Sequence, residues 1–308
     1  MINEKKKTIV LMKRYWQMYL LLLLPIVYLL IFHYYPMLGV QIAFKRFRSS
    51  LGIWGSEWIG FTHFIRFFQS YQFSRVISNT VLLSVYSLIA GFPLPIIFAL
   101  LLNTITHPQT KKVIQTVTYL PYFISTVVLV GMLFQVLDPR IGIYGKFFYA
   151  ITDTRASDLF GRAANFRHIF VWSGVWQNMG WNSIIYLAAL SAVSPELHEA
   201  GKIDGMSRFM RVIYIDFPAI LPTASILLIL NFGGIMSVGF EKVWLLQNNL
   251  NLSTSEVIST YVYKIGLITG GGDFSYATAI GLFNSVINLI LIFTFNKICN
   301  RIGGNSLW

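Results

Sequence analysis

Aromatic and amide side chains recur along one otherwise apolar stretch of the chain, residues 166–193. The candidates for ligand contact there are Trp172, Trp176, Gln177, Asn178, Trp181, Asn182 and Tyr186. Residues four apart on a helix share a face, so Asn178 and Asn182 would be presented together. Rings that stack on sugar faces beside amides that bond hydroxyl groups would suit an uncharged oligosaccharide. Interhelical packing explains the same residues, and the sequence leaves both interpretations open.

Further polar side chains lie within or beside two later apolar stretches. Polar groups inside a membrane are unfavourable and usually face the bundle interior or a water-filled path. We therefore expect four more candidates for a substrate path: Asn231, Glu241, Asn284 and Asn288. Each of them could equally pack between helices or, for Glu241, lie at the membrane interface.

Catalytic and metal-binding patterns are missing from the sequence. The single cysteine, Cys299, excludes an internal disulfide and a cysteine-based zinc site. The five histidines are scattered without metal-ligand spacing, and there is no G-x-x-x-x-G-K-[ST] phosphate loop. No nucleophile–base pair or intramembrane His/Asp cluster supports a membrane-embedded enzyme. The sequence therefore predicts a non-enzymatic protein that binds no metal or cofactor of its own.

Residues 195–218 form a charged interruption, PELHEAGKIDGMSRFMRVIYIDFP, between two apolar runs. Ser194 is a plausible N-cap, Pro195 suits the first helical position, and Glu196 and Glu199 suit the positive end of a helix dipole. Gly205 after Asp204 permits a tight turn. We expect a short helix, a turn at 204–205 and a second helical piece over 206–215. Such a pair could contact a soluble partner, or it could be an ordinary solvated loop.

The elements that position these residues are predicted to be membrane spans. Of the 308 residues, 55% are hydrophobic and only 12% are charged, against about 25% charged in soluble domains. We expect an all-α membrane protein with six spans, at 16–35, 76–102, 113–137, 166–193, 218–240 and 274–295. The first is read as a retained span because no cleavage site follows it. The net charge of +12 favours basic loops beside anionic lipid over nucleic-acid binding.

Prolines and charges add detail to this arrangement. Pro93 and Pro95 should kink the second span, and Pro121 lies inside the third. FTHFIRFF, residues 61–68, could be a short interfacial helix or a plain loop. Six spans put both termini on one side, but lysine and arginine divide equally, twelve of 24 on each side. The charge distribution therefore does not settle the orientation.

The charged interruption resembles the EAA motif, roughly EAAxxDGAxxxxxFxxIxLP, of membrane subunits of binding-protein-dependent ABC importers. Glu199-Ala200, Asp204-Gly205 and Pro218 have its spacing, whereas Gly201, Met206 and Val212 depart from it. Four other stretches are similar to the LplB/YteP type of MalF-like sugar permease: 119–121, 176–189, 259–263 and 274–284. The resemblance covers about residues 15–308.

The resemblance implies a MalF-like type I ABC importer permease fold in a bacterial cell membrane, with both termini cytoplasmic, in a Gram-positive organism. It implies that Glu196, Glu199, Ala200, Asp204, Gly205 and Pro218 couple the chain to an ATPase. Two copies of that ATPase would bind ATP and magnesium. A second related permease would complete a heterodimer, and a solute-binding lipoprotein would deliver the oligosaccharide; nucleic acid is not an expected partner.

The resemblance also suggests how the chain is divided. Residues 1–75 would hold the basic segment, the first span and an external loop. Residues 76–297 would form the permease domain with its coupling loop at 195–218, and residues 298–308 a cytoplasmic tail. Two alternatives stay open, an ABC importer for an amino acid or peptide and a membrane scaffold, although a scaffold needs no ATPase-docking loop.

Overall fold

The computed structural model describes residues 14–270 and 272–303 and is almost wholly helical. Its one pair of strands within those residues is short and antiparallel, β1 (Lys45–Arg46) with β2 (Glu57–Trp58). The chain divides into two compact units. One comprises residues 1–67 and 265–282, and the other comprises 68–264 and 283–308. The predicted domain boundaries at 75 and 297 are a different division and stay a prediction.

The first unit begins with one long helical stretch. It runs through α2 (Trp16–Leu29), a π turn η1 (Leu30–Tyr34), α3 (Tyr35–Met37) and a 3-10 segment η2 (Leu38–Phe44). The predicted first span was too short at its end, since Pro36 lies in the first turn of α3, where a missing N–H is tolerated. No residue of α2 is buried by the rest of this chain, so its apolar surface is exposed.

The rest of the first unit joins α5 (Thr62–Gln69) to the beginning of α18 (Phe274–Gly303), with α4 (Gly52–Gly55) before it. The helix expected at 61–68 is therefore confirmed as a helix. The Arg66 guanidinium lies 2.6 Å from an Asp273 carboxylate oxygen and 4.1 Å from the centre of the Tyr276 ring. These two contacts hold α5 against the first turn of α18.

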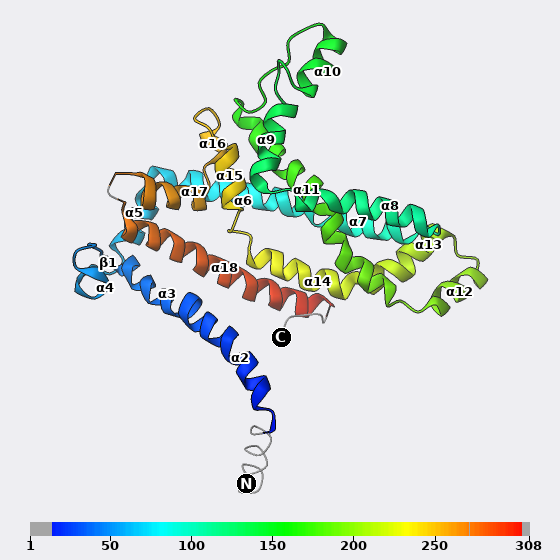
Figure 1. Cartoon of the computed structure of the whole chain (residues 1–308), viewed down its shortest axis with the longest axis horizontal. Coiled ribbons are helices and arrows are strands. Elements are labelled where there is room, and N and C mark those ends of the chain that lie inside the picture. The colour runs from blue at the N-terminus through cyan, green and yellow to red at the C-terminus, as the bar shows by residue number, and fades with distance from the viewer. Residues whose placement is uncertain (1–13, 271, 304–308) are drawn as a thin grey trace. The chain divides into compact units, whose positions relative to one another are not determined.

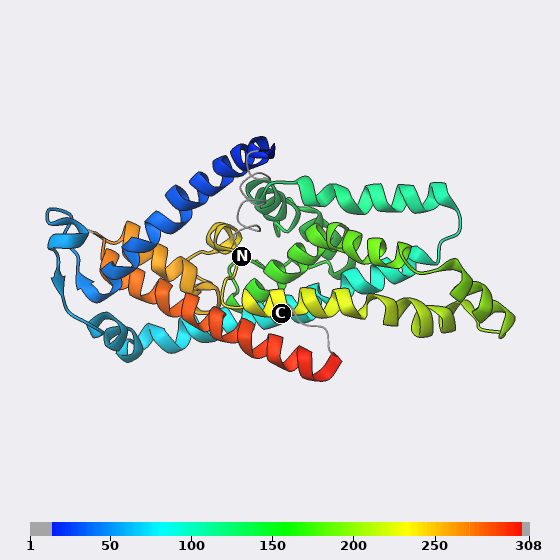
Figure 2. The ribbon, with the colours of Figure 1, turned by 90° about the horizontal axis from the view of Figure 1, so that it is seen from below.

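The second unit is built around α11 (Ala163–Ser191), which packs against α6, α7, α8 and α14 (Figure 1 and Figure 2). Gly180 of α11 makes close packing possible, because a β-carbon there would lie 2.2 Å from the Thr118 carbonyl oxygen of α8. The remaining elements are α6 (Tyr71–Gly91), α7 (Pro93–Asn103), α8 (Pro108–Tyr119), η3 (Leu120–Phe123), α9 (Thr126–Val136), α10 (Ile143–Thr152), α12 (Pro195–Ile203), α13 (Arg208–Arg211), η4 (Val212–Asp216), α14 (Phe217–Gly233), α15 (Phe240–Leu246), α16 (Leu252–Ser255), α17 (Ile258–Tyr263) and η5 (Lys264–Ile268).

Four helical stretches among the described residues are long and apolar enough to cross a membrane: Trp16–Phe44, Tyr71–Asn103, Arg208–Gly233 and Phe274–Arg301. A fifth is the pair Pro108–Phe123 and Thr126–Val136, bent by 100°. The all-helical membrane fold is confirmed, but the predicted count of six spans is not reached by length and composition. The predicted span at 166–193 corresponds to α11, whose 29 residues are about 43 Å long but carry too many polar side chains.

Prolines interrupt two of these stretches, as the sequence suggested. Phe92 separates α6 from α7, where Pro93 occupies the first helical turn. At Pro121 the chain forms the 3-10 segment η3 and then turns sharply into α9. The Gln177 side chain of α11 donates a 2.8 Å hydrogen bond to the Ile124 carbonyl oxygen at this break. The bend therefore depends on a polar side chain from the neighbouring helix.

The boundaries of the fifth predicted span need correction. The second helical piece does not stop before Pro218 but continues through α13, the π turn η4 and α14. Pro218 lies in the first turn of α14, where its missing N–H is tolerated. The helix ends at Gly233, well before the predicted residue 240, and residues 234–239 are not helical. Gly233 also packs closely against Ile292 of α18, because a β-carbon there would lie 2.9 Å from that side chain.

Candidate functional site: a polar cavity and a charged helical hairpin

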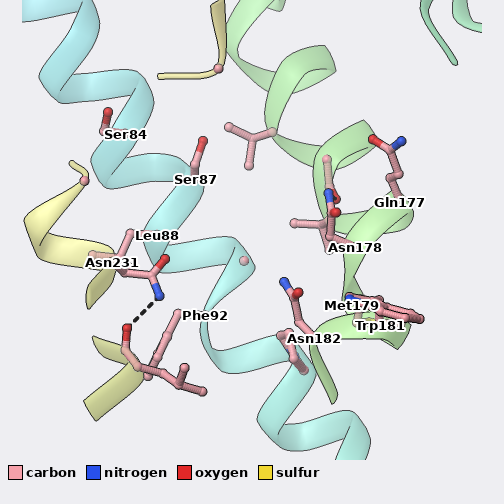
Figure 3. A pocket seen from close by; sticks show the side chains of 18 of the residues that line it. Ser84, Ser87, Leu88, Phe92, Gln177, Asn178, Met179, Trp181, Asn182 and Asn231 are labelled. Atoms are coloured by element: carbon pink, nitrogen blue, oxygen red, sulfur yellow. Dashed lines mark hydrogen bonds between the residues drawn. The ribbon is translucent and has the colours of Figure 1, made fainter. Parts of the chain in front are cut away.

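The second unit contains a cavity of about 950 Å³, bounded by α6, the beginning of α7, α11, the end of α14 and residues 234–242. Its wall is mainly apolar, with polar groups from three helices. Figure 3 shows the side chains of Ser84 and Ser87 from α6, of Asn178 and Asn182 from α11, and of Asn231 from α14 around the same space. An apolar cavity with a few convergent polar groups is the usual form of a binding site for a small molecule.

Six of the candidates for ligand contact line this cavity: Gln177, Asn178, Trp181, Asn182, Tyr186 and Asn231. The Gln177 amide is bonded to the Ile124 carbonyl oxygen, and two of the three asparagine amides are already occupied. The Asn178 and Asn231 amide nitrogens each donate a 2.8 Å hydrogen bond to a carbonyl one turn earlier, at Gly174 and Leu227. Asn182 makes no hydrogen bond to any residue that the structure describes, and its side chain is exposed. Its amide is therefore the freest of the three for a ligand.

Trp181 lines the cavity and also packs against the break in the third predicted span. Its ring stacks on Tyr122 with centroids 4.3 Å apart and planes 4° apart, and it meets Phe123 edge-on. One face of the indole is therefore covered by protein. Stacking on a sugar would have to use the other face or the ring edge, so packing accounts for part of this residue's role.

The other five predicted path residues do not line the cavity: Trp172, Trp176, Glu241, Asn284 and Asn288. The Trp172 indole nitrogen donates a 2.8 Å hydrogen bond to the Tyr86 hydroxyl. Asn288 bonds the Met236 backbone nitrogen at 3.0 Å and the Ser237 hydroxyl at 2.9 Å. Asn288 thus fixes the segment that follows α14, which is the packing interpretation of that residue.

Asn284 differs from Asn288, one turn away on α18. Its amide oxygen is buried and has no hydrogen-bond partner among the described residues. Ser87, on the cavity wall, has a buried hydroxyl oxygen in the same condition. Buried polar groups without a partner are uncommon, so Ser87 adds a free hydroxyl to the cavity that residue spacing did not indicate.

Lys242 of α15 is a cavity residue that the sequence did not single out. Its ammonium group donates a 2.9 Å hydrogen bond to the Phe170 carbonyl oxygen and lies 4.9 Å from the centre of the Phe170 ring. Burial lowers the pKa of Lys242 from 10.5 to about 8. The sequence gives little indication of this position, because a single lysine after Glu241 is typical of a solvent-exposed loop. Only the packing of α15 on α11 brings it to the cavity.

The charged hairpin, residues 194–216, lies beyond the C-terminal end of α11 (Figure 1). The Ser194 hydroxyl accepts a 3.3 Å hydrogen bond from the Glu196 backbone nitrogen, which confirms the predicted N-cap. Gly205 has φ +80°. Its nitrogen bonds the Lys202 carbonyl, and the Met206 nitrogen bonds the Gly201 carbonyl, as in a Schellman C-cap. The predicted helix and turn are thus both present.

Two contacts hold the hairpin closed. A β-carbon at Gly201 would lie 3.2 Å from the Met206 sulfur and 3.3 Å from an Ile215 methyl group. The glycine that departs from the EAA pattern is therefore a point of close approach. The second contact joins His198 Nε2 to a buried Asp216 carboxylate oxygen at 3.2 Å, which the Asn103 amide also approaches at 3.5 Å. Asp216 thereby connects α12 to the end of α7, a link that the sequence did not reveal.

The outer surface of the hairpin combines charge with exposed apolar side chains. Glu196, Glu199, Ala200, Asp204 and Gly205 are all exposed. Ile203 is 87% exposed and Phe209 is 72% exposed, although both lie close to the charged turn. Large apolar side chains that protrude beside charges at the tip of a hairpin are typical of a protein-binding surface. Within the described residues, no group of three His, Cys, Asp or Glu could hold a metal ion.

The chain is similar to known transport proteins in both sequence and structure. The chain is 41% identical to protein LplB of Bacillus subtilis, over 96% of the chain and 92% of the relative. It is 37% identical to the polygalacturonan/rhamnogalacturonan transport system permease protein YteP of Bacillus subtilis, over 99% and 94%. A crystal structure of a bacterial ABC transporter involved in the import of the acidic polysaccharide alginate contains a chain that superposes with a TM-score of 0.87. That chain is 39% identical, with 95% of this chain and 98% of that one covered.

A family model for the inner membrane component of binding-protein-dependent transport systems matches residues 91–302. The matched region includes α11, the charged hairpin and most of the cavity wall. Such components are transport subunits rather than enzymes, which agrees with the prediction from the sequence. The chain belongs to the family of binding-protein-dependent transport system inner membrane components.

Proposed function

We propose that the chain is the permease subunit of an ATP-driven importer for oligosaccharides and forms half of the translocation path. One observation carries the proposal: the middle of α11 lines a cavity with several polar groups, and its end leads directly into a hairpin with the EAA spacing. A ligand site and a partner-binding site are thus built on consecutive helices. The relatives named for transport of polygalacturonan/rhamnogalacturonan and alginate support a carbohydrate cargo.

The hairpin is the proposed docking element for an ATPase subunit. Its exposed Ile203 and Phe209 would enter a cleft on the ATPase, and Glu199 and Asp204 would contact charged groups around that cleft. The links from Asp216 to His198 and Asn103 would pass a displacement of α12 to α7 and α14. ATP and magnesium would be bound by two copies of the ATPase.

The remaining partners and the location follow from the same proposal. A second, related permease would supply the other half of the path, and an extracellular lipid-anchored binding protein would deliver the sugar. A solved structure that matches this chain includes an alginate pentasaccharide-bound periplasmic protein, which supports a binding-protein partner. The family is an inner membrane component; we further propose that both termini are cytoplasmic and that the source is Gram-positive.

Uptake in reconstituted vesicles tests this function. The chain would be purified with its permease partner and ATPase, and ATP-dependent uptake of labelled oligosaccharide would be measured with the binding protein outside. Glu199→Lys and Asp204→Lys should reduce uptake at least about tenfold while the subunits still copurify. Glu57→Lys is the matched control, since Glu57 is also exposed but lies on β2. Normal uptake in both hairpin variants would rule out the coupling role.

A further inference from the structure

The described part of the cavity wall carries one charged side chain, and its charge is positive. Among the described residues that line the cavity, Lys242 is the one with an ammonium or guanidinium group, and neither aspartate nor glutamate contributes. The other polar groups of the wall are hydroxyls and amides, which are neutral. A ligand in this space therefore meets one fixed positive charge.

Lys242 also lacks an acidic partner, unlike other cations of the chain. Arg75 pairs with Glu256, Arg66 with Asp273, and Arg46 with Glu57. No carboxylate oxygen of the described residues lies within 4.0 Å of the Lys242 nitrogen. A lysine has three N–H donors, and only the Phe170 carbonyl takes one of them. Two donors thus remain without a protein acceptor at a partly buried site, where an unpaired charge is unfavourable.

Packing alone explains this arrangement poorly. The bond to Phe170 does fasten α15 to α11, but a neutral donor such as glutamine could make it without bringing a charge beside an apolar wall. The ring of Phe170 offsets part of the unfavourable desolvation by a cation–π contact. What the site still lacks is an anion, and a carboxylate next to the ammonium group would supply charge-assisted hydrogen bonds.

We propose that Lys242 binds a carboxylate of the cargo, so that the cavity selects oligosaccharides that contain uronic acid units. This inference rests on the proposed function and narrows it from oligosaccharides to acidic ones. The Lys242 nitrogen lies 3.3 Å from where a β-carbon of Gly174 would be, and Gly174 and Asn178 are about 6 Å apart along α11. A carboxylate at Lys242 and hydroxyl groups at Asn178 and Asn182 can thus belong to neighbouring sugar units of one chain. Asn182 is exposed and has a free amide for those hydroxyls.

Equilibrium binding of two matched sugars tests the proposal. The complex of this chain with its permease partner and ATPase would be placed in lipid nanodiscs. The binding protein would be left out, because its own sugar selectivity would otherwise affect the measured affinities. Calorimetry would compare trigalacturonate with galactotriose, in which a neutral CH₂OH replaces each carboxylate. The wild-type complex should bind the acid at least about tenfold more tightly, because hydrogen bonds to charged groups are worth roughly 1.4 kcal/mol or more.

Variants of the lysine locate the preference. Lys242→Gln should reduce the preference for the acid to less than about twofold, whereas Lys242→Arg should keep it, because the positive charge is retained. Lys146→Gln is the matched control, since Lys146 is an exposed lysine of α10 and its loss should leave the preference unchanged. A preference that survives in Lys242→Gln would overturn the proposal.

If the Lys242→Gln variant does not assemble, a modified ligand tests the same proposal on the wild-type complex. Methyl esterification of trigalacturonate removes its negative charges and should weaken binding to the wild-type complex at least about tenfold; equal binding of acid and ester would overturn the proposal. If the complex binds and imports galactotriose as well as the acid or better, the inference fails and the oligosaccharide function stands. If it neither binds nor imports either sugar, the proposed function fails and the inference with it.

Discussion

The cavity and the charged hairpin are consecutive along the chain but are stabilised in different ways. The cavity wall comes from helices far apart in sequence, and several of its polar groups are bonded to their own helix or to a neighbouring break. The hairpin is stabilised by a cap at Ser194, a left-handed glycine at 205 and the contact at Gly201, all within 22 residues. Because its stabilising contacts are local, the structure of the hairpin can be predicted from the sequence. The cavity forms only when distant helices pack together, so it cannot be predicted in the same way.

The difference predicts that the cavity region is the more sensitive to packing changes. Gly180→Leu should prevent α8 from lying against α11, because even a β-carbon there would meet the Thr118 carbonyl oxygen at 2.2 Å. We expect a destabilisation of about 3 kcal/mol, the upper end of the range for overpacked sites, seen as loss of copurifying complex and a lower melting temperature. Gly131→Leu is the control, since no atom lies within 4 Å of a β-carbon at that exposed glycine. Equal losses in both would contradict the packing argument.

The hairpin should instead lose coupling while the fold survives. Gly205→Val places a β-branched residue at φ +80°, which is unfavourable by about 1–2 kcal/mol, although its β-carbon would meet no atom within 4 Å. Uptake should fall about tenfold, with sugar binding to the complex unchanged. Gly205→Asn should retain most of the uptake, because asparagine tolerates the left-handed region. Similar uptake in the valine and asparagine variants would show that the backbone angle does not matter.

The cavity, unlike the hairpin, should respond to pH in the alkaline range. Burial lowers the pKa of Lys242 to about 8, so the ammonium form predominates below pH 8 and is lost above it. Binding of trigalacturonate should therefore weaken as the pH rises through about 8, and binding of galactotriose should not.

The control for this pH dependence is Lys242→Arg, since arginine stays charged over the whole range and should remove the effect. The elements packed against α15 carry other charged or titratable groups: Arg167, His168 and Tyr186 on α11 and Tyr261 and Tyr263 on α17, with none on α9. An arginine variant with an unchanged pH profile would assign the titration to the histidine or one of the tyrosines instead.

Single amides of the cavity should have the smallest effects, and unequal ones. Asn182→Ala should weaken sugar binding by about tenfold or less, as for one lost hydrogen bond. Asn178→Ala should weaken it less, because the Asn178 amide nitrogen is already bonded to the Gly174 carbonyl. Calorimetry on both variants ranks them, and a larger loss for Asn178 would show that its bond opens when sugar binds.

The sequence was sufficient for features that depend on neighbours in the chain. The apolar runs marked most of the helical stretches, the two prolines after Gly91 marked the break at Phe92, and the residues 194–205 marked a capped helix and its turn. Each of these follows from propensities and caps within a few residues. The family resemblance then suggested an ATPase-docking role for the hairpin, which composition alone left open between docking and a plain loop.

Long-range features were out of reach for the same reason. A proline at 121 indicates a weak point, but the 100° bend depends on Gln177 and Trp181 arriving from another helix. Asn288 looked like a ligand group and proves to be bonded to residues 236 and 237. Lys242 and Asp216 have ordinary sequence surroundings, and only packing gives one a place on the cavity wall and the other a place between three helices.

The single positive charge on the cavity wall has a consequence for the membrane as a barrier. An importer that opens its path to each side in turn must not let protons or sodium ions through, since each ion that leaks dissipates the membrane potential. A fixed ammonium group beside the path, with no carboxylate oxygen of the described residues within 4.0 Å, raises the electrostatic barrier for small cations. Lys242 would thus oppose the passage of small cations at the stages of the cycle when no acidic sugar is bound beside it.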